Sequence, residues 1–397
     1  MLTYADALKI VKETVSPLPS QIQPLTTAIG QVIAKPVCAR WDMPRWDNSA
    51  MDGFAVSSQA LDSTAGLDIV GSSFAGHPYN KTLQRNEAIQ ITTGAPLPCG
   101  ADTVIPVEDT SVNDNCLSWT GTIRAKQHVR YQGEEYCEGE RLVNAGTVVD
   151  AGTIGLLTGA GITEVAVYPR PRVAIFSTGD ELLNPGQDPG PGQIINSNLQ
   201  YLQARLQECG CTVLPLGIGA DQRDNLGLIY KQAKEADLIV STGGVSVGEK
   251  DLVQQTLLDN GFERKFWKVA IKPGKPLLFG LLNHKPCFGL PGNPAATAST
   301  FELFVLPALR ILAGHGTTDR KMTARLKHGV KAGGSRHAFL WSRCEWQGDG
   351  YHVEVPQRQG SGQTRSIQGA NALLSLAVGS PDLKTGDKVE IFPLYSL

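Results

Sequence analysis

Residues 237–251 read DLIVSTGGVSVGEKD, and this stretch decides the fold expected for the chain. Residues 238–241 form a short apolar run typical of a buried strand, and residues 242–244 provide a tight, glycine-rich turn. A helix is predicted over residues 252–260, with Asp251 at its start. A strand, a glycine-rich turn and a helix can form an anion cradle, because free amides and the helix dipole favour phosphate. Taken alone, the turn fits a purely structural corner equally well.

The composition describes an ordinary soluble globular protein. The 397 residues are 41% hydrophobic and 19% charged, with a net charge of −2, and about two to four domains are expected from the length. The near-neutral charge argues against a nucleic-acid surface. The eight cysteines are scattered, with no CxxC pair, which favours reduced thiols in a cytoplasmic protein. The N-terminus lacks the pattern of a signal peptide, and no apolar run approaches the roughly 18 residues of a membrane span.

The pattern of apolar and polar residues along the chain predicts a multi-domain α/β plus β protein. Thr3 is a good N-cap for a helix over residues 4–15, and a second short helix is predicted over residues 26–33. Strands are predicted over residues 164–167, 173–177, 213–218 and 238–241, and helices over residues 197–208 and 223–235. Alternation of strands and helices over residues 172–312 is typical of βαβ units around a parallel or mixed sheet. The predicted domains are a discontinuous helical linker domain (1–38 and 140–170), a β-rich insert domain (39–139), a central three-layer α/β domain (171–318) and a small C-terminal β-barrel (319–397).

Polar clusters follow three strands of the predicted α/β domain. They are STGDE at residues 177–181, GAD at residues 219–221 and the glycine-rich loop with Asp251. Since ligands bind at the carboxyl ends of parallel strands, we expect the three clusters to share one pocket. Singly, each acid could be a solvated cap or turn residue. Together they would crowd so many carboxylates that a divalent cation or raised pKa values are needed.

Four further motifs carry candidate chemistry. KPGKP at residues 272–276 holds two lysines in a stiff loop, which suits a fixed oxyanion site, although a rigid turn with solvated lysines is the alternative. LPGNP at residues 290–294 predicts a helix entry whose amides could also contact an anion. In the β-rich segment, DNSAMDGFAV at residues 47–56 and TTGAPLP at residues 92–98 hold more polar groups than a turn requires, although plain loops remain possible.

These motifs, in this order, resemble the molybdopterin molybdenumtransferase family, which includes MoeA and the E domain of gephyrin. The resemblance covers essentially the whole chain. It implies Mg²⁺-dependent insertion of molybdate into adenylated molybdopterin with release of AMP, giving the molybdenum cofactor. It also implies an elongated cytoplasmic homodimer whose active site is shared between subunits, with a molybdopterin adenylyltransferase and apo-molybdoenzymes as possible partners, and with no nucleic acid or membrane.

The resemblance assigns roles to residues that match the family motifs. Two lysines, Lys272 and Lys275, would accept molybdate together with Arg336 and Ser361 of the tail. The implied catalytic residues are Asp52, Asp180, Glu181, Asp221, Asp251, Lys268 and Lys272, and the implied metal ligands are Glu181, Asp221 and Asp251. The other implied ligand-binding residues are Thr93, Thr178, Gly179, Thr242, Gly243, Gly244, Ser246, Gly248, Pro291, Gly292, Asn293 and Pro294.

The sequence departs from the family pattern at four places. Phe54 replaces a tyrosine, Glu135 replaces an aspartate, and Asn196 replaces another aspartate, so that one possible carboxylate is missing. In the tail, Trp341 stands where a second arginine is usual, which weakens the molybdate assignment of Arg336 relative to the lysines.

Two alternative functions are compatible with parts of the pattern. A molybdopterin adenylyltransferase shares the TGG loop, but its relatives resemble only the α/β portion and carry a second Thr-Gly after it. A non-catalytic scaffold would be the gephyrin-like alternative. The acids and both KPGKP lysines argue against a scaffold, because a scaffold has little need of them. Loss of activity in a folded Asp251→Ala or Lys272→Ala variant distinguishes an enzyme from a scaffold.

Overall fold

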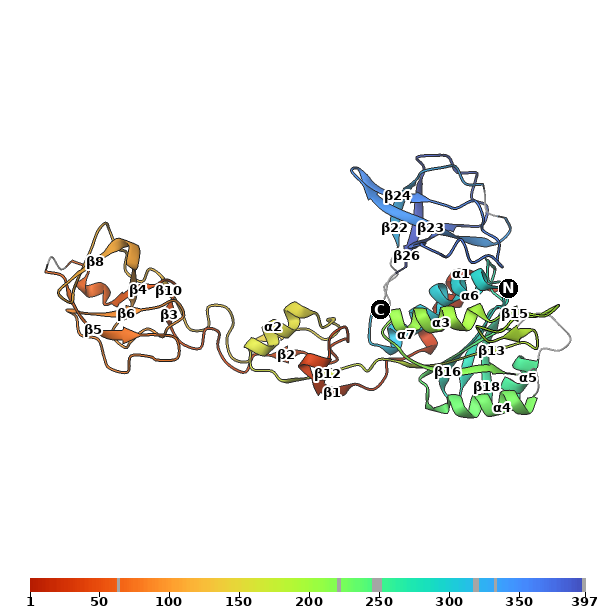
Figure 1. The fold of residues 1–397 in the computed structure, drawn as a ribbon, viewed down its shortest axis with the longest axis horizontal. Coiled ribbons are helices and arrows are strands. Elements are labelled where there is room, and N and C mark those ends of the chain that lie inside the picture. The colour runs from red at the N-terminus through yellow and green to blue at the C-terminus, as the bar shows by residue number, and fades with distance from the viewer. Residues whose placement is uncertain (63–64, 220–222, 245–251, 317–320, 332–333, 395–397) are drawn as a thin grey trace. The chain divides into compact units, whose positions relative to one another are not determined.

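The chain folds into two compact units. The computed structural model describes residues 1–62, 65–219, 223–244, 252–316, 321–331 and 334–394 (Figure 1). Unit 1 comprises Met1–Ile22, Gly30–Ala34 and Ala166–Leu397, and unit 2 comprises Gln23–Ile29 and Lys35–Val165. Short strands β1 (Gln21–Pro24) and β12 (Glu164–Val167) lie where the chain passes between the units. The four predicted domain boundaries stay predictions, and each unit is described by itself.

Unit 1 is built on a six-stranded mixed sheet with the order β16-β13-β17-β21-β20-β18. The first four strands are parallel, and β20 and β18 continue the sheet antiparallel. The predicted strands at residues 173–177, 213–218 and 238–241 are confirmed. The strands are β13 (Arg172–Thr178), β16 (Thr212–Gly219), β17 (Leu238–Thr242), β18 (Phe262–Trp267), β20 (Leu278–Leu282) and β21 (Lys285–Leu290), with a small pair β14 (Leu182–Leu183) and β15 (Ile194–Ile195) beside them.

Helices cover this sheet. The predicted N-terminal helix is confirmed as α1 (Tyr4–Thr14). Thr3 caps this helix as predicted, since its hydroxyl accepts a hydrogen bond from the Asp6 amide at 3.1 Å. The predicted helices at residues 197–208 and 252–260 are also found. The remaining helices are α3 (Ser197–Glu208), α4 (Arg223–Gln232) with the 3₁₀ turn η4 (Ala233–Glu235), α5 (Leu252–Asp259), α6 (Pro294–Thr300), the π-helical turn η5 (Phe301–Val305) and α7 (Leu306–Leu312).

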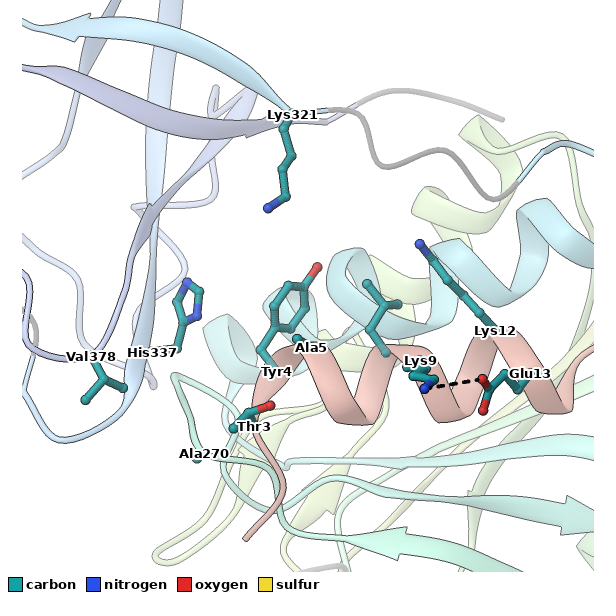
Figure 2. Close-up of a pocket in the computed structure, with 11 residues that line it drawn as sticks. Thr3, Tyr4, Ala5, Lys9, Lys12, Glu13, Ala270, Lys321, His337 and Val378 are labelled. Atoms are coloured by element: carbon teal, nitrogen blue, oxygen red, sulfur yellow. Dashed lines mark ion pairs between the residues drawn. The ribbon is translucent and has the colours of Figure 1, made fainter.

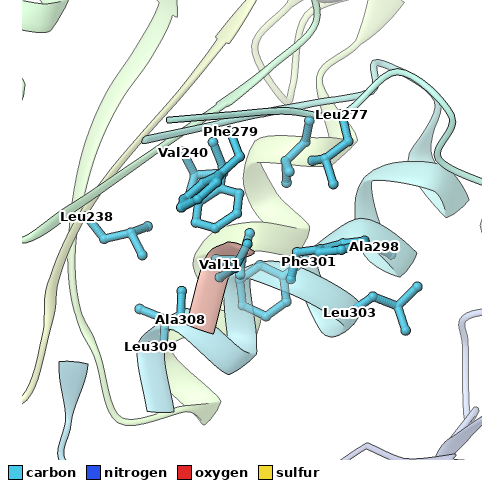
Figure 3. Packing of buried hydrophobic residues seen from close by; sticks show 14 of the residues in the cluster. Val11, Leu238, Val240, Leu277, Phe279, Ala298, Phe301, Leu303, Ala308 and Leu309 are labelled. Atoms are coloured by element: carbon cyan, nitrogen blue, oxygen red, sulfur yellow. The ribbon is translucent and has the colours of Figure 1, made fainter. Parts of the chain in front are cut away.

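The main core lies where α1 and the α6–α7 segment meet the sheet. Val11 of α1 packs with Val240 of β17, Phe279 of β20 and Phe301 of η5, and all four side chains are buried (Figure 3). Pro294–Leu312 is long and apolar enough to span a membrane by length and composition alone, which the sequence prediction overlooked. Since 83% of it is buried inside the fold, it serves here as a core helix.

The C-terminal part of unit 1 is a small β-barrel, as predicted. Strands β23, β24, β22, β26 and β25 pair in that order, and an additional pairing of β23 with β25 closes the five-stranded barrel. The short strand β19 adds to its rim by pairing with β23. The strands are β19 (Ile271–Lys272), β22 (Met322–Leu326), β23 (His337–Gln347), β24 (Gly350–Glu354), β25 (Ala372–Leu376) and β26 (Lys388–Pro393).

Unit 2 is mainly β, as its alternating sequence predicts. A six-stranded sheet has the order β7-β4-β6-β5-β9-β8, and Phe54, Ile89 and Ile105 are buried in its cores. Its elements are β2 (Val37–Cys38), β3 (Asn48–Ser49), β4 (Gly53–Val56), η2 (Ser58–Ala60), β5 (Leu67–Ser73), β6 (Glu87–Ile91), β7 (Thr103–Pro106), η3 (Val107–Asp109), β8 (Thr110–Asn113), β9 (Cys116–Trp119), β10 (Val129–Arg130), β11 (Arg141–Val143) and α2 (Ala151–Gly159).

The predicted helix at residues 26–33 is wrong. Only the 3₁₀ turn η1 (Leu25–Thr27) forms there. Gly30 has a φ of +78°, which ends any right-handed helical turn, and Ile33 forms a β-bridge with Val167. The apolar spacing in this segment therefore reflects burial of extended chain rather than a helix face.

Candidate functional site

The carboxyl ends of four parallel strands meet at one edge of the unit 1 sheet. Thr178 at the end of β13 pairs with Gly219 of β16, and Ser177 pairs with Thr242 of β17. Thr242 in turn pairs with Leu290, the last residue of β21. This register brings the segments after β13 and β17 together, as predicted, and adds the segment after β21. Residues 220–221 of the predicted GAD cluster lie outside the described residues.

At Gly243 the turn after β17 comes very close to the backbone at the end of β13. Its amide donates a hydrogen bond to the Leu290 carbonyl at 3.2 Å, and its φ is +87°. A Cβ at this position would lie 2.3 Å from the Thr178 carbonyl oxygen. The Gly292 position is also close, since a Cβ there would lie 3.8 Å from the Gly243 Cα. Only glycine fits at residue 243, and the TGG turn therefore packs directly against the end of β13.

A buried network of polar side chains supports the strand ends. The Ser177 hydroxyl lies 2.9 Å from the Thr242 hydroxyl and donates to the Asn196 Oδ1 at 3.2 Å. The same Oδ1 accepts from the Leu199 amide and so caps α3. The resemblance implies an aspartate at residue 196, and here the Asn196 side-chain amide ties α3 to the ends of β13 and β17.

Two buried donors beside this network have no hydrogen-bond partner within the described part of the chain. They are the Thr178 Oγ1 and the Asn196 Nδ2, on side chains that are 2% and 3% exposed. Because an unpaired buried polar group costs free energy, such groups are normally satisfied by a ligand or water. A ligand could satisfy either donor only if it reached the buried end of β13 or the start of α3.

The LPGNP turn joins α6 to the C-terminal barrel. Pro294 occupies the first turn of α6, as predicted, and Asn293 is the N-cap residue. Its Nδ2 donates to the Ser361 hydroxyl at 3.1 Å, while the Ala295 amide donates to the Ser361 carbonyl at 2.9 Å. Asn198, which the sequence reasoning missed, donates from Nδ2 to the Gly292 carbonyl at 2.7 Å. The second asparagine of the N-S-N triplet at the start of α3 was its only sequence signal.

The KPGKP loop lies between α6 and the barrel rim. A Cβ on Gly274 would lie 2.5 Å from the Thr300 methyl group of α6, so that the loop packs tightly there. Arg336 donates from Nη1 to the Ile271 carbonyl at 3.1 Å, next to Lys272. The ammonium groups of Lys272 and Lys275 belong to exposed residues, so a fixed loop presents two accessible cations.

Lys268 is held differently from the other two lysines. Its Nζ lies 3.6 Å from the centre of the Trp267 ring, which is cation–π geometry. The residue has a positive φ of 69°, and its amide donates to the Leu277 carbonyl at 3.0 Å. The contact with Trp267 orients the Lys268 ammonium group. Among the described residues, no contact joins Lys268 to Lys272.

The acidic residues are only partly described. Asp180 and Glu181 follow β13 and are exposed, and a Cβ on Gly179 would lie 2.6 Å from a Glu181 carboxylate oxygen. Asp221, Asp251, Ser246 and Gly248 lie outside the described residues. Within the described ranges, no group of three or more His, Cys, Asp or Glu side chains could hold a metal ion, so the predicted metal set stays a prediction.

Asp52 and Thr93 pair within unit 2. The Asp52 Oδ1 accepts hydrogen bonds from the Thr93 amide at 2.7 Å and from the Thr93 hydroxyl at 3.0 Å. The backbone hydrogen bond and then the hydroxyl lower the pKa of the Asp52 carboxyl below its usual value. Asp52 is therefore an exposed carboxylate at neutral pH, held in one orientation by the TTGAPLP segment.

We expect Gly243→Ala to destabilise the protein by more than the strain of its positive φ alone. The new Cβ would meet the Thr178 carbonyl, and the positive φ adds strain, so we expect a loss of about 2 kcal/mol or more in unfolding free energy. Gly186→Ala is the matched control, because Gly186 has a similar φ of +90° and open space around it. Equal urea-unfolding midpoints for the two variants would contradict the expected close packing.

Three family models match the chain in succession. The MoeA N-terminal region (domains I and II) matches residues 2–161, the probable molybdopterin-binding domain matches residues 174–311, and the MoeA C-terminal region (domain IV) matches residues 323–394. The strand-end edge described above lies in the second of these regions, and Ser361 and Arg336 lie in the third. Together with the fold, these matches define a protein of molybdenum cofactor biosynthesis.

Full-length relatives fix the family. The chain is 35% identical to the molybdopterin molybdenumtransferase of Nostoc sp. over 99% of this chain and 94% of that protein. It is 31% identical to the molybdopterin molybdenumtransferase of Haemophilus influenzae over the whole of both chains. A crystal structure of the molybdopterin biosynthesis MoeA protein from Pyrococcus horikoshii superimposes with a TM-score of 0.86 at 30% identity, covering 99% of each chain. The chain belongs to the molybdopterin molybdenumtransferase family.

Proposed function

We propose that this enzyme inserts molybdate into adenylated molybdopterin, with Mg²⁺, and releases AMP. The observation that carries the proposal is the convergence of the β13, β17 and β21 ends in a chain related to molybdopterin molybdenumtransferases over its full length. The eight cysteines, all within the described residues, form no disulfide with one another, which supports a cytoplasmic enzyme. Transfer of substrate from a molybdopterin adenylyltransferase, and of product to apo-molybdoenzymes, belongs to the same proposal.

The TGG turn and the end of β13 are the proposed cradle for the pterin and its phosphates. Gly243 brings the backbone close to Thr178, and the unpaired hydroxyl of Thr178 supplies a donor at the same edge. Ser246 and Gly248 are assigned to the continuation of this loop by the family resemblance. Because a ligand phosphate would satisfy donors that are otherwise buried and unpaired, the cradle is suited to anion binding before substrate arrives.

The KPGKP loop and the barrel rim are the proposed molybdate site. Lys272 and Lys275 supply two exposed cations from a packed loop, and Arg336 is held beside Lys272 by its bond to the Ile271 carbonyl. Ser361 is held against Asn293 at the start of α6. Molybdate is a dianion, so two or three fixed cations offset its charge while leaving its oxygens free to exchange.

The carboxylates at the strand ends fit the requirements of Mg²⁺. Asp180 and Glu181 are exposed oxygen donors at the edge where the phosphates are proposed to bind. Glu181 is assigned to the metal, together with Asp221 and Asp251. When bound, Mg²⁺ would neutralise charge that develops on the pyrophosphate as AMP leaves. The side chains themselves hold the metal and orient the phosphates, and Lys268 is the proposed additional cation.

The first test is release of AMP from adenylated molybdopterin by the purified protein. We expect release that requires both molybdate and Mg²⁺. Tight binding of the adenylated pterin with no release under any of these conditions would overturn the proposed transfer. Release from molybdopterin and ATP in place of the adenylated pterin would instead identify an adenylyltransferase.

A homodimer is proposed in which Asp52 and Thr93 of one subunit complete the active site of the other. These two residues lie in unit 2, far along the chain from the KPGKP lysines of unit 1. We expect the Asp52→Asn protein and the Lys272→Ala protein each to be inactive alone. An equal mixture of the two, denatured and refolded together, should regain about a quarter of wild-type activity. Half of the dimers in the mixture would then carry one variant subunit of each kind, and each of these would have one intact site. Mixing either variant with itself is the control. No recovery in verified heterodimers would show that both residues act in the same subunit.

A further inference from the structure

Gln359 joins the segment that follows β24 to the barrel strand β23, and no sequence motif singled it out. The Trp341 amide of β23 donates to the Gln359 Oε1 at 3.1 Å, and the Gln359 Nε2 donates to the Trp341 carbonyl at 2.9 Å. The same Nε2 also donates to the Pro356 carbonyl at 3.0 Å. A side-chain amide that pairs with both the N–H and the C=O of one residue imitates a neighbouring strand. We call these contacts the Gln359 clamp.

The clamp occupies a position where the barrel lacks a strand. β24 ends at Glu354, opposite Arg343, and therefore offers no partner at Trp341. On its other side, Trp341 lies opposite Leu373 of β25. Since Trp341 is 2% exposed, leaving its backbone N–H and C=O unpaired would cost free energy. The Gln359 amide therefore continues the β23 ladder beyond the end of β24.

The clamp also fixes the segment that carries Ser361, two residues further along the chain. Residues 356–362 form no helix or strand, and among the described residues no backbone hydrogen bond joins them to β23. At the other side of the segment, the Asn293 Nδ2 donates to the Ser361 Oγ at 3.1 Å, and the Ala295 amide donates to the Ser361 carbonyl at 2.9 Å. Ser361 is thus held between β23, through Gln359, and the start of α6.

β23 is itself a fixed frame that does not depend on Gln359. Its first residue, His337, donates from its amide to the Ala270 carbonyl at 3.1 Å. The His337 ring lies 5.6 Å from the Tyr4 ring of α1, and both residues line the cavity between α1 and the barrel (Figure 2). Phe339 and Trp341 are buried in the main core of unit 1. Loss of the clamp should therefore loosen residues 356–362 and leave β23 in place.

We propose that Gln359 is a positioning residue for molybdate, which it serves by fixing the Ser361 segment on β23. This inference rests on the proposed function, in which Ser361 contributes to the molybdate site. Because the exposed Ser361 Oγ accepts from Asn293, its own O–H is available to donate to an oxyanion. Trp341 stands where the resemblance implies a second arginine. Its backbone would support the site here through Gln359, while its side chain packs in the core.

Calorimetric titration of the full chain with sodium molybdate tests this proposal without the adenylated pterin. Gln359→Met keeps the length of the side chain and removes its hydrogen bonds. We expect it to bind molybdate about three- to tenfold more weakly, because binding must then order the Ser361 segment. In the AMP-release assay, the KM for molybdate should rise by a similar factor, while kcat at saturating molybdate stays within about twofold.

Asn371→Leu is the matched control, because Asn371 makes the same kind of clamp elsewhere on β23. The Cys344 amide donates to the Asn371 Oδ1 at 2.7 Å, and the Asn371 Nδ2 donates to the Cys344 carbonyl at 2.7 Å. No residue of the candidate site lies beside this second clamp in the sequence. Asn371→Leu should bind molybdate as the wild type does, and urea unfolding measures the stability that each variant loses.

The outcomes separate this proposal from the proposed function. Positioning by Gln359 is overturned if Gln359→Met binds molybdate as tightly as the wild type. It is also overturned if Asn371→Leu weakens binding by the same factor, since a general loosening of the barrel would then be the cause. A wild-type chain that binds no molybdate overturns it as well. A wild-type chain that binds molybdate but releases no AMP refutes the proposed transfer alone, and the titration of the two variants still decides the role of Gln359.

Discussion

Lys272→Ala should lower molybdate-dependent release of AMP by about 10² to 10³-fold, which is the usual effect of removing one preorganised electrostatic group. The reason lies in the position of the residue. Lys272 is exposed at the end of β19, beside Arg336 and in a loop that Gly274 packs against α6. A cation held by such a fixed backbone needs little reorganisation when an oxyanion binds, so its removal costs more than loss of a mobile surface lysine.

Two controls make this expectation specific. Lys231→Ala removes an exposed lysine from the last turn of α4 and should leave the rate unchanged. Lys272→Arg keeps the charge and should retain part of the activity. Because the Lys272 residue is exposed, its loss should not change the thermal unfolding of the chain. A rate within threefold of wild type for Lys272→Ala would remove this lysine from the proposed molybdate site.

The α/β elements could be predicted because burial imposes a clear period on their sequences. The helix at Ser197–Glu208 and the strand at Glu164–Val167 occur with the predicted bounds. Residues 262–290 were harder, because β18, β20 and β21 are short antiparallel neighbours and Gly280, Pro286 and Gly289 interrupt β20 and β21. In the tail, Trp341 is 2% exposed and packs in the main core of unit 1, so this position serves packing where the resemblance implies an arginine.

The site could be predicted at the level of motifs but not of contacts. Polar residues after successive strands indicated one edge of the sheet, and the register of Ser177, Thr242 and Leu290 places them there. The bond between Asn293 and Ser361 depends on how the tail folds back on α6, which no local pattern encodes. The unpaired Asn196 Nδ2 was equally invisible, because its environment is set by tertiary packing.

Removing Arg205 should destabilise unit 1 by about 3 to 5 kcal/mol, since it would leave a buried carboxylate without its cation. Arg205 of α3 donates from Nε to the Glu302 Oε1 at 2.7 Å and from Nη2 to Oε2 at 3.2 Å, which is bidentate geometry. The two side chains are 10% and 3% exposed. Glu302 lies in the π-helical turn η5, so this pair ties α3 to the central core helix.

The pH dependence of Arg205→Met should identify the buried carboxylate as the cause. Burial raises the pKa of Glu302, and the hydrogen bonds and charge of Arg205 oppose that rise. Without the guanidinium the folded-state pKa would rise further. A raised folded pKa means that stability is retained below the unfolded pKa, about 4.3, and is lost as the pH rises through the folded value. The difference in unfolding free energy between the wild type and Arg205→Met should therefore become smaller as the pH is lowered from 8 to 5.

Two further variants separate the charge from the packing of this pair. Glu208→Gln is the matched control, because Glu208 contacts the same guanidinium at 3.1 Å but is 64% exposed, and it should change the unfolding free energy by about 0.5 kcal/mol or less. Arg205→Met combined with Glu302→Leu should recover most of the loss, since no buried charge remains. Urea unfolding of the full chain measures all three. A double variant as unstable as Arg205→Met would show that side-chain volume, and not the orphaned carboxylate, sets the cost.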